Sequence, residues 1–553
     1  MHLPIRWRVA AAVLLVLLSP GLRAQQSDAE RQSLEELRNT VIGMLQALVD
    51  KGLLTREQAE QLVKQAQAKA AADAAAAAAR NAAQAKEEQN AVRVPYVPEI
   101  VKDQIRKDVL AEVKPNIQKD VAQQLNQPGT VFAALPAWMR RITWLGDIRI
   151  RGEGDQFATD NVPDVYLNYN DINSLGGIQK AGPLALLNVS RDQDRLRLRA
   201  RFGFDVNLDS GWTAALVMAT GSTGEVIATT NQTLGTYGAG YTATIDQGYL
   251  RWTGKWLDDS QIFTAYAGRF SSPWVGTDLV WYNDLTFEGI VSAYRMNFSD
   301  DNEHRKELFI TAAAMPLSSF SPFDNQPDAV QKWMLGGQLG TDLTFDDESR
   351  LRVAAAYYDY LHILGERNAL DSTLDNWSAP AFVQKGNTLF DIANPSVPGS
   401  TNLFALASNY RIVDLILVEE LRTGQLHSLG LTLEALRNIG FNAAEVAARV
   451  GSYVAPRVDG YRADVSFGTS TVPAFGDWRA TIGYRYLQRD AVLDAFNDED
   501  FHLGGTDTKG YTVMFDFNFT PQVWMRMKYM SADAIDGPAL GIDVWQVDMN
   551  TSF

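Results

Sequence analysis

Apolar and polar residues alternate with a period of two from about residue 142 to the C-terminus of this 553-residue chain. Successive side chains of a β-strand point to opposite sides, so this period predicts strands with one apolar and one polar face. The pattern is clear in residues 142–153, 195–209, 333–345, 478–486, 511–519 and 523–529, and weaker in 411–420 and 441–450.

The length of these segments distinguishes a membrane barrel from a soluble sandwich. Strands of soluble proteins average about five or six residues, whereas a tilted strand that crosses a bilayer needs about nine to eleven. Tight turns at 208–211 and 346–349 contrast with long loops at 153–194 and 364–409, an asymmetry typical of outer-membrane barrels. Tryptophans near the expected strand ends suit interfacial girdles: Trp144, Trp212, Trp252, Trp281, Trp333 and Trp478.

A sheet that spans a membrane must close, because an open edge leaves backbone groups unpaired in lipid. At roughly 50 residues per hairpin, the segment 142–553 holds about 16 strands, within a range of about 14–18. A barrel of this size leaves a water-filled lumen. We therefore predict an all-β fold: a transmembrane antiparallel β-barrel of about 16 strands, preceded by an α-helical segment.

The last strand carries a sorting pattern. Trp545, Val547, Met549 and Phe553 alternate with polar residues, and the printed sequence ends on Phe553. An aromatic residue that closes an amphipathic strand looks like the signal read by the outer-membrane assembly machinery, so these residues are the predicted assembly signal.

Three segments are expected before the barrel. Residues 1–24 resemble a secretory signal peptide, because two arginines precede ten consecutive apolar residues and a small-residue end at Ala24. Residues 25–92 are predicted to be helical and periplasmic, with a short coiled-coil-like heptad seam that would either join three chains or fold back on its own hairpin. Residues 93–141 are expected to be a proline-punctuated linker containing a helix.

Composition excludes several kinds of chemistry. The chain has no cysteine and five histidines, which rules out thiolate metal sites and leaves little imidazole chemistry. Loss of Arg6, Arg8 and Arg23 with the signal peptide changes the formal charge from −16 to −19, which disfavours nucleic-acid binding. No cofactor and no metal site is expected.

Short motifs distributed along the chain resemble the putative porin family of Gram-negative outer membranes and, more distantly, the phosphate-selective porins. The matching stretches are 48–55, 94–100, 146–151, 268–270 with 278–281, 490–496 and 504–507. The resemblance covers nearly all of the chain after the signal peptide. It implies a barrel with a periplasmic helical N-terminus and pore activity, and it specifies no solute.

An arginine row is the sharpest feature of the expected lumen. Guanidinium groups stay charged and bind carboxylates or phosphates bidentately. The row would form either an anion-selective wall or a wall neutralised by nearby acids, and neutralisation is the favoured reading. The candidate selectivity residues are Arg149, Arg151, Arg195, Arg197, Arg199 and Arg201, and the candidate lumen acids are Asp147, Glu153 and Asp205.

Two loops are further candidates. Residues 153–194 would either fold inward as a constriction or project outward. Asp498, Glu499 and Asp500 would form either a divalent-cation site or, as we favour, a solvated acidic face, because their spacing is not that of a calcium loop.

The predicted function is passive diffusion of small hydrophilic solutes and ions through the outer membrane, with a possible preference for anions. The alternative is a structural tether whose helical N-terminus binds the cell wall or a periplasmic partner. A barrel enzyme is disfavoured, since no histidine has a serine or acid partner in a recognisable motif. Expected partners are outer-membrane lipid, the assembly machinery, the solutes and further copies of the chain in a homotrimer.

Overall fold

The computed structural model describes residues 139–553, except 222–229, 300–305, 320–328, 346, 371, 395–401, 425 and 470–473. All of these residues belong to the unit Gly129–Phe553. The predicted signal peptide (1–24), the helical segment (25–92) and nearly all of the linker (93–141) lie outside the described residues and remain predictions.

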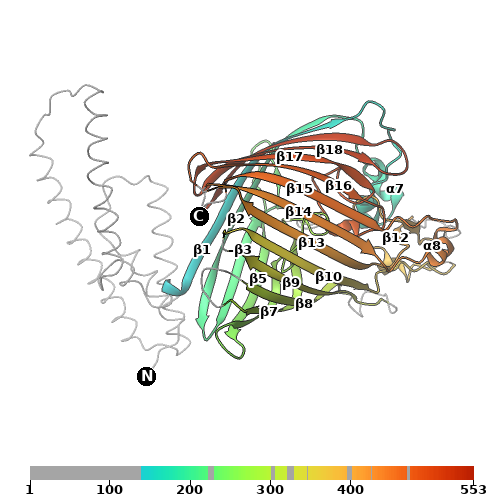
Figure 1. The fold of residues 1–553 in the computed structure, drawn as a ribbon. Helices are drawn as coiled ribbons and strands as arrows, with labels where there is room; N and C mark the ends of the chain where they lie inside the picture. The colour runs from blue at the N-terminus through green and yellow to red at the C-terminus, as the bar shows by residue number, and fades with distance from the viewer. Residues whose placement is uncertain are drawn as a thin grey trace, which may run out of the picture. The chain divides into compact units, whose positions relative to one another are not determined.

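Sixteen long antiparallel strands form a closed barrel (Figure 1), as the alternation predicted. Each strand pairs with the next along the chain, and the last pairs with the first through eleven consecutive positions, from Asp147–Ser552 to Phe157–Ile542. The strands are β1 Ile142–Phe157, β2 Gln193–Asp209, β3 Trp212–Thr220, β5 Ala243–Lys255, β6 Gln261–Ser271, β7 Thr286–Asn297, β8 Lys306–Ser318, β9 Lys332–Thr344, β10 Arg350–Leu361, β13 Arg411–Arg422, β14 His427–Asn438, β15 Asp459–Thr469, β16 Trp478–Leu487, β17 Thr508–Thr520, β18 Val523–Ala534 and β19 Gly541–Ser552.

Shorter elements lie in the connections. The two-residue strand β4 (Gln232–Thr233) pairs with β2, and β11 (Leu389–Asp391) pairs with β12 (Phe404–Leu406). The helices are α6 Tyr169–Ser174, α7 Ile178–Ala181 and α8 Ala443–Val450, with 3₁₀ turns η1 Met139–Arg141, η2 Gly182–Ala185, η3 Asn376–Ser378 and η4 Asp494–Phe496. No helix in the described part of the chain is both long enough and apolar enough to cross a membrane.

The two ends of the barrel differ, as expected. At one end, which we call the turn end, tight turns join the strands; Asp209, Ser210 and Gly211 have φ angles of 73°, 50° and 85° between β2 and β3. At the other, the loop end, the connections are long and carry α7, α8 and β12 (Figure 1). The loops that matter below are 158–192, 272–285, 362–410 and 488–507.

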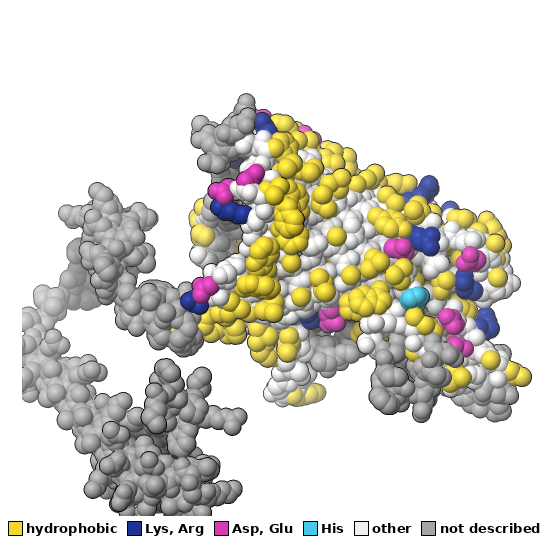
Figure 2. Space-filling model, turned by 90° about the horizontal axis from the view of Figure 1, so that it is seen from below, with side chains coloured by type: hydrophobic (Ala, Val, Ile, Leu, Met, Phe, Trp, Pro, Cys, Tyr) yellow, Lys and Arg dark blue, Asp and Glu magenta, His cyan; other side chains and the backbone are white. Residues whose placement is uncertain are grey.

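The outer face of the barrel is apolar. On β1, Ile148 and Ile150 are 38% and 48% exposed, while the intervening Arg149 is 9% exposed and faces the lumen. Figure 2 shows apolar side chains over the middle of the wall, with most charged groups gathered toward its ends. Such a band suits a lipid surround.

An apolar core occupies part of the lumen. Loop 272–285 folds inward, and its Trp281 packs edge-on against Tyr358 of β10, with ring centroids 5.0 Å apart and planes at 90°. Loops 362–410 and 488–507 add to this core, which packs against the inward faces of strands β6–β10, β13 and β14. Trp281 is only 4% exposed, so its predicted place in an interfacial girdle is wrong.

One other expectation needs correction. Residues 441–450 are not a strand; Ala443–Val450 form helix α8, because Asn442 caps its N-terminus through the backbone N–H groups of Ala444 and Glu445 and Gly451 ends it in a left-handed conformation. Loop 272–285 folds into the lumen. Residues 153–194, for which the sequence left an inward fold and an outward projection open, line part of the cavity described below.

Candidate functional site

The arginine row lies on the lumen side of the first two strands. In the β1–β2 register, Arg149 stands opposite Arg199 and Arg151 opposite Arg197. Arg195 and Arg201 face the same side of β2, since residues two apart share a face. Six guanidinium groups therefore line one wall.

Carboxylates of β1 neutralise much of this charge. Asp147 lies 2.8 Å from Arg199 and 2.6 Å from Arg201, and Glu153 lies 2.7 Å from Arg195. Asp155 adds a contact of 2.6 Å to Arg195. The alternation of the two strands predicted this arrangement, because side chains on the same face of neighbouring strands lie within reach of each other.

An acid from the inward loop crosses to the wall. Asp284 of loop 272–285 lies 2.7 Å from Arg199 and 3.1 Å from Arg149. Burial opposes ionisation of Asp284, but Arg149, Arg199 and Arg201 outweigh it and lower its pKa below the ordinary value. Asp284 is thus an ionised anchor that fastens the loop to the arginine row.

A second acid contacts the arginine row from loop 488–507. Asp500 of loop 488–507 lies 2.7 Å from Arg151, which also forms a bidentate pair with Asp548 of β19 at 2.7 and 2.9 Å. Burial again opposes ionisation, but Arg151, Lys528 and Arg197 lower the pKa of Asp500. The network therefore joins β1, β2, β19 and the two loops 272–285 and 488–507.

The predicted solvated face at 498–500 is wrong. Asp498 is 2% exposed and lies 3.2 Å from Arg485 and 3.8 Å from Lys528. Asp278 of loop 272–285 also contacts Arg485 and Arg462. These acids face cations of the wall. Within the described residues, no group of three or more His, Asp or Glu side chains is arranged to hold a metal ion.

Among the described residues, carboxylates outnumber the guanidinium groups along the arginine row. Eight carboxylates lie within 4.0 Å of its six guanidinium groups: Asp147, Glu153, Asp155, Asp246, Asp284, Glu499, Asp500 and Asp548. The row is a paired network rather than an exposed cationic ladder.

The remaining predicted residues lie apart from this network. Asp205 stands four residues beyond Arg201 on β2, opposite Thr143 and Ala215. On β19, the apolar residues of the predicted assembly signal face outward: Trp545, Val547, Met549 and Phe553 are 52%, 49%, 44% and 65% exposed.

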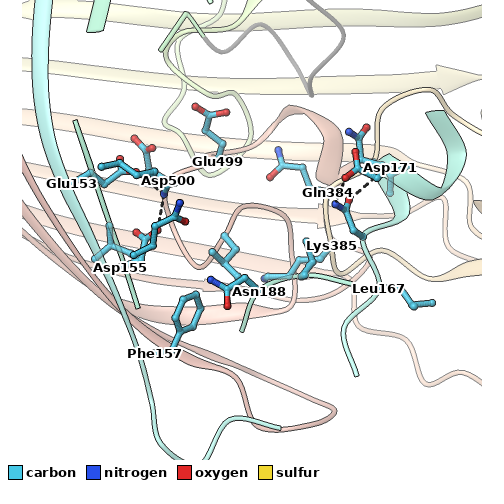
Figure 3. A pocket seen from close by; sticks show the side chains of 18 of the residues that line it. Glu153, Asp155, Phe157, Leu167, Asp171, Asn188, Gln384, Lys385, Glu499 and Asp500 are labelled. Carbon is cyan, nitrogen blue, oxygen red and sulfur yellow. Dashed lines mark hydrogen bonds and ion pairs between the residues drawn. The ribbon is translucent and has the colours of Figure 1, made fainter. Parts of the chain in front are cut away.

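A cavity of about 420 Å³ adjoins the row at the loop end (Figure 3). Its wall includes Arg195, Arg197, Glu153 and Asp155 of the row, together with parts of loops 158–192, 362–410 and 488–507. We call this cavity the vestibule.

Sequence reasoning missed Asp284, Asp500 and Asp548 as members of the site. Asp548 could have been predicted from the sequence, because it lies between Val547 and Met549, which face outward, and therefore faces the lumen. Asp284 and Asp500 carried none, because their positions depend on how two loops fold within the lumen.

Known structures with the same general fold are outer-membrane proteins. The chain is similar to Pseudomonas putida OprB at high pH (11% identity, TM-score 0.41, 75% of this chain and 95% of that one). It is also similar to the outer membrane channel DcaP of Acinetobacter baumannii (9%, 0.35, 74% and 97%) and to Vibrio cholerae OmpT in a trimer form (10%, 0.37, 74% and 99%).

The comparison with curated protein sequences found no match. A match to a protein family, in contrast, extends over most of the chain. The family described as "Putative porin" matches residues 38–553. This match includes the whole barrel and the network described above, and porins are channel proteins rather than enzymes. The chain therefore belongs to the putative porin family, as the sequence motifs indicated, and is an outer-membrane channel.

Proposed function

We propose that this porin is a passive diffusion channel for small hydrophilic solutes and ions. The observation that carries the proposal is the charged network on the lumen side of β1 and β2, held opposite an apolar core formed by inward loops. A polar wall beside a partly filled lumen supports the movement of hydrated solutes along that wall.

Single-channel recording of the refolded barrel in a planar bilayer tests this proposal. Stable conductance steps in symmetric salt are the expected result, and they should be small for a barrel of sixteen strands because loops fill part of the lumen. Barrel that is demonstrably folded, by heat-modifiable mobility, but passes no current would overturn the channel. It would favour the tether, in which residues 25–92 bind the cell wall or a periplasmic partner.

The sign of ion selectivity is a finer question. Six arginines favour an anion preference, but eight carboxylates lie within 4.0 Å of them. We therefore propose weak selectivity with no strong preference for anions. The reversal potential under a tenfold salt gradient measures this sign directly.

We further propose that the chain forms a homotrimer, with its N-terminal helices in the periplasm, and that β19 presents the signal for the assembly machinery. Support for the trimer comes from the heptad seam in residues 25–92 and from the trimer form named for Vibrio cholerae OmpT. The mass of the full chain in mild detergent tests it, and a monomeric mass would overturn it.

A further inference from the structure

The vestibule has the features of a solute-binding site. It is enclosed by β1, the beginning of β2 and three loops, and its volume of about 420 Å³ falls within the range typical of small-molecule pockets. Because it shares Arg195 and Arg197 with the arginine row, a solute bound there would contact the row directly.

The charge of its lining is negative. Five carboxylates face three basic side chains: Glu153, Asp155, Asp171, Glu499 and Asp500 against Arg195, Arg197 and Lys385. Figure 3 shows these acids reaching the cavity from more than one side. Arg151, which does not line the cavity, contacts Asp500 at 2.7 Å and Glu153 at 3.7 Å, so the excess of acid is small. An anionic solute would meet weak net repulsion, and a cationic one weak attraction.

The charged side chains of the lining, acids as well as bases, already have partners. Arg195 contacts Glu153 at 2.7 Å and Asp155 at 2.6 Å. The Lys385 ammonium lies 2.7 Å from Nδ1 of His502, and burial lowers its pKa to about 7, so it is only partly charged at neutral pH. Each carboxylate can accept several hydrogen bonds, so it keeps acceptor capacity beyond its ion pair. The lining consequently offers more capacity to accept hydrogen bonds than to donate them.

A buried acceptor in the lining has no partner. Asn170 of α6 is 9% exposed, and its Oδ1 receives no hydrogen bond from any described group. A buried acceptor without a donor is costly, so a donor on a bound solute would stabilise the site. The Nε atoms of Arg195 and Arg197 also lack partners among the described residues. They would suit an acceptor elsewhere on the same solute.

Apolar groups complete the wall. Phe157, Leu167, Leu187, Val383 and Leu503 border the polar groups. They provide surface against which a short aliphatic chain can pack. The combination of acidic groups and apolar walls matches a solute whose amine is separated from its other polar groups by methylenes.

From these observations we propose that the vestibule binds small amine-bearing solutes of net positive charge, with basic amino acids such as lysine as the best-matched chemistry. This proposal deepens the diffusion-channel function and relies on it only for placing the site on the solute path.

Isothermal titration calorimetry on the folded barrel in detergent, with L-lysine, L-glutamate and glucose as probes, tests the proposal. We expect L-lysine to bind at least about tenfold more tightly than L-glutamate, and glucose to bind no better than L-glutamate. Equal binding of the three probes, tighter binding of L-glutamate or glucose, or no binding of L-lysine would overturn it.

Two isosteric variants locate the site. Glu499→Gln removes a vestibule carboxylate and should weaken L-lysine binding about tenfold. Asp160→Asn removes the same charge from an exposed position of loop 158–192 that does not line the cavity, and it should leave binding unchanged. Equal effects of the two variants, or none from Glu499→Gln, would contradict the assigned site.

The binding experiment and the conductance experiment fail independently. A barrel that conducts but does not bind L-lysine refutes the vestibule assignment alone. A barrel that binds L-lysine but never conducts refutes the channel and leaves the binding site in place.

Discussion

Gly146 and Phe553 exchange two backbone hydrogen bonds of 3.0 Å, each N–H donating to the carbonyl oxygen of the other residue. They close the barrel seam at the turn end. A Cβ atom added to Gly146 would lie 2.4 Å from the Phe553 ring, so the seam requires either glycine here or a displaced ring.

We predict that Gly146→Val destabilises the barrel by about 1–3 kcal/mol, because overpacking displaces the Phe553 ring. Gly152→Val is the matched control, since Gly152 lies on the same strand with nothing within 4 Å of an added Cβ. Thermal unfolding in detergent, followed by heat-modifiable mobility, measures both. Equal melting temperatures would show that the ring yields without cost.

Removing cations from the row should expose its acids. We predict that Arg197→Gln combined with Arg199→Gln shifts the reversal potential toward cation selectivity, because Asp147, Glu153 and Asp284 lose partners. The measurement is a bi-ionic or salt-gradient recording. Arg437→Gln serves as a control, since Arg437 pairs with Asp459 at an exposed position. Unchanged selectivity in the double variant would remove the row from any role in ion selection.

Asp284 should hold loop 272–285 in place. We predict that Asp284→Asn destabilises the loop by roughly 3 kcal/mol, because Arg149 and Arg199 lose a buried counter-charge. The expected signs are noisier current and a shift of selectivity toward anions. If the open-channel noise and reversal potential match those of the unmodified protein, the loop is held by its apolar contacts alone.

Stability should depend on pH through Asp494. Burial raises the pKa of Asp494 to about 7 from an ordinary 3.8, so the folded state favours the protonated form. The stability that Asp494 contributes is therefore greatest below pH 4 and is lost as pH rises to 7, by roughly 4 kcal/mol in total. Asp494→Asn should abolish this loss.

Melting temperatures of both proteins between pH 4 and 7.5 check this prediction through their difference. Lys385, whose pKa falls to about 7 from 10.5 on burial, changes stability mainly above pH 7. Because Asp494 is one of the groups that raise the pKa of Lys385, Asp494→Asn lowers that pKa further, so the decisive part of the comparison lies below pH 6. The pKa of His502 is lowered by burial and by Lys385, and this effect cancels in the difference. A difference that stays constant across the range would contradict the assignment.

The barrel was predictable because its determinants are local. The alternation in 195–209 predicts that the arginines of β2 face the lumen. A shift of the strand register by one residue would turn them toward the lipid. The same parity placed Asp147 and Glu153 beside the row. Strand number followed from length, since the spacing of hairpins depends on bilayer thickness.

The loops were not predictable because their structure depends on distant contacts. Trp281 has the same chemistry as a girdle tryptophan, yet it packs against Tyr358 inside the lumen. From the sequence, Asp500 has the pattern of a solvated acid, because its partner Arg151 lies 349 residues away along the chain. Local pattern also misjudged residues 441–450, where a cap at Asn442 begins a helix.

The ion pair between Arg151 and Asp548 joins residues 397 positions apart. Because β1 and β19 are the first and last strands, this pair cannot form until the ring has closed. The charged wall is therefore complete only in the closed barrel. An open sheet would hold Arg151 without this partner, so sealing the sheet and completing the charged wall are a single event.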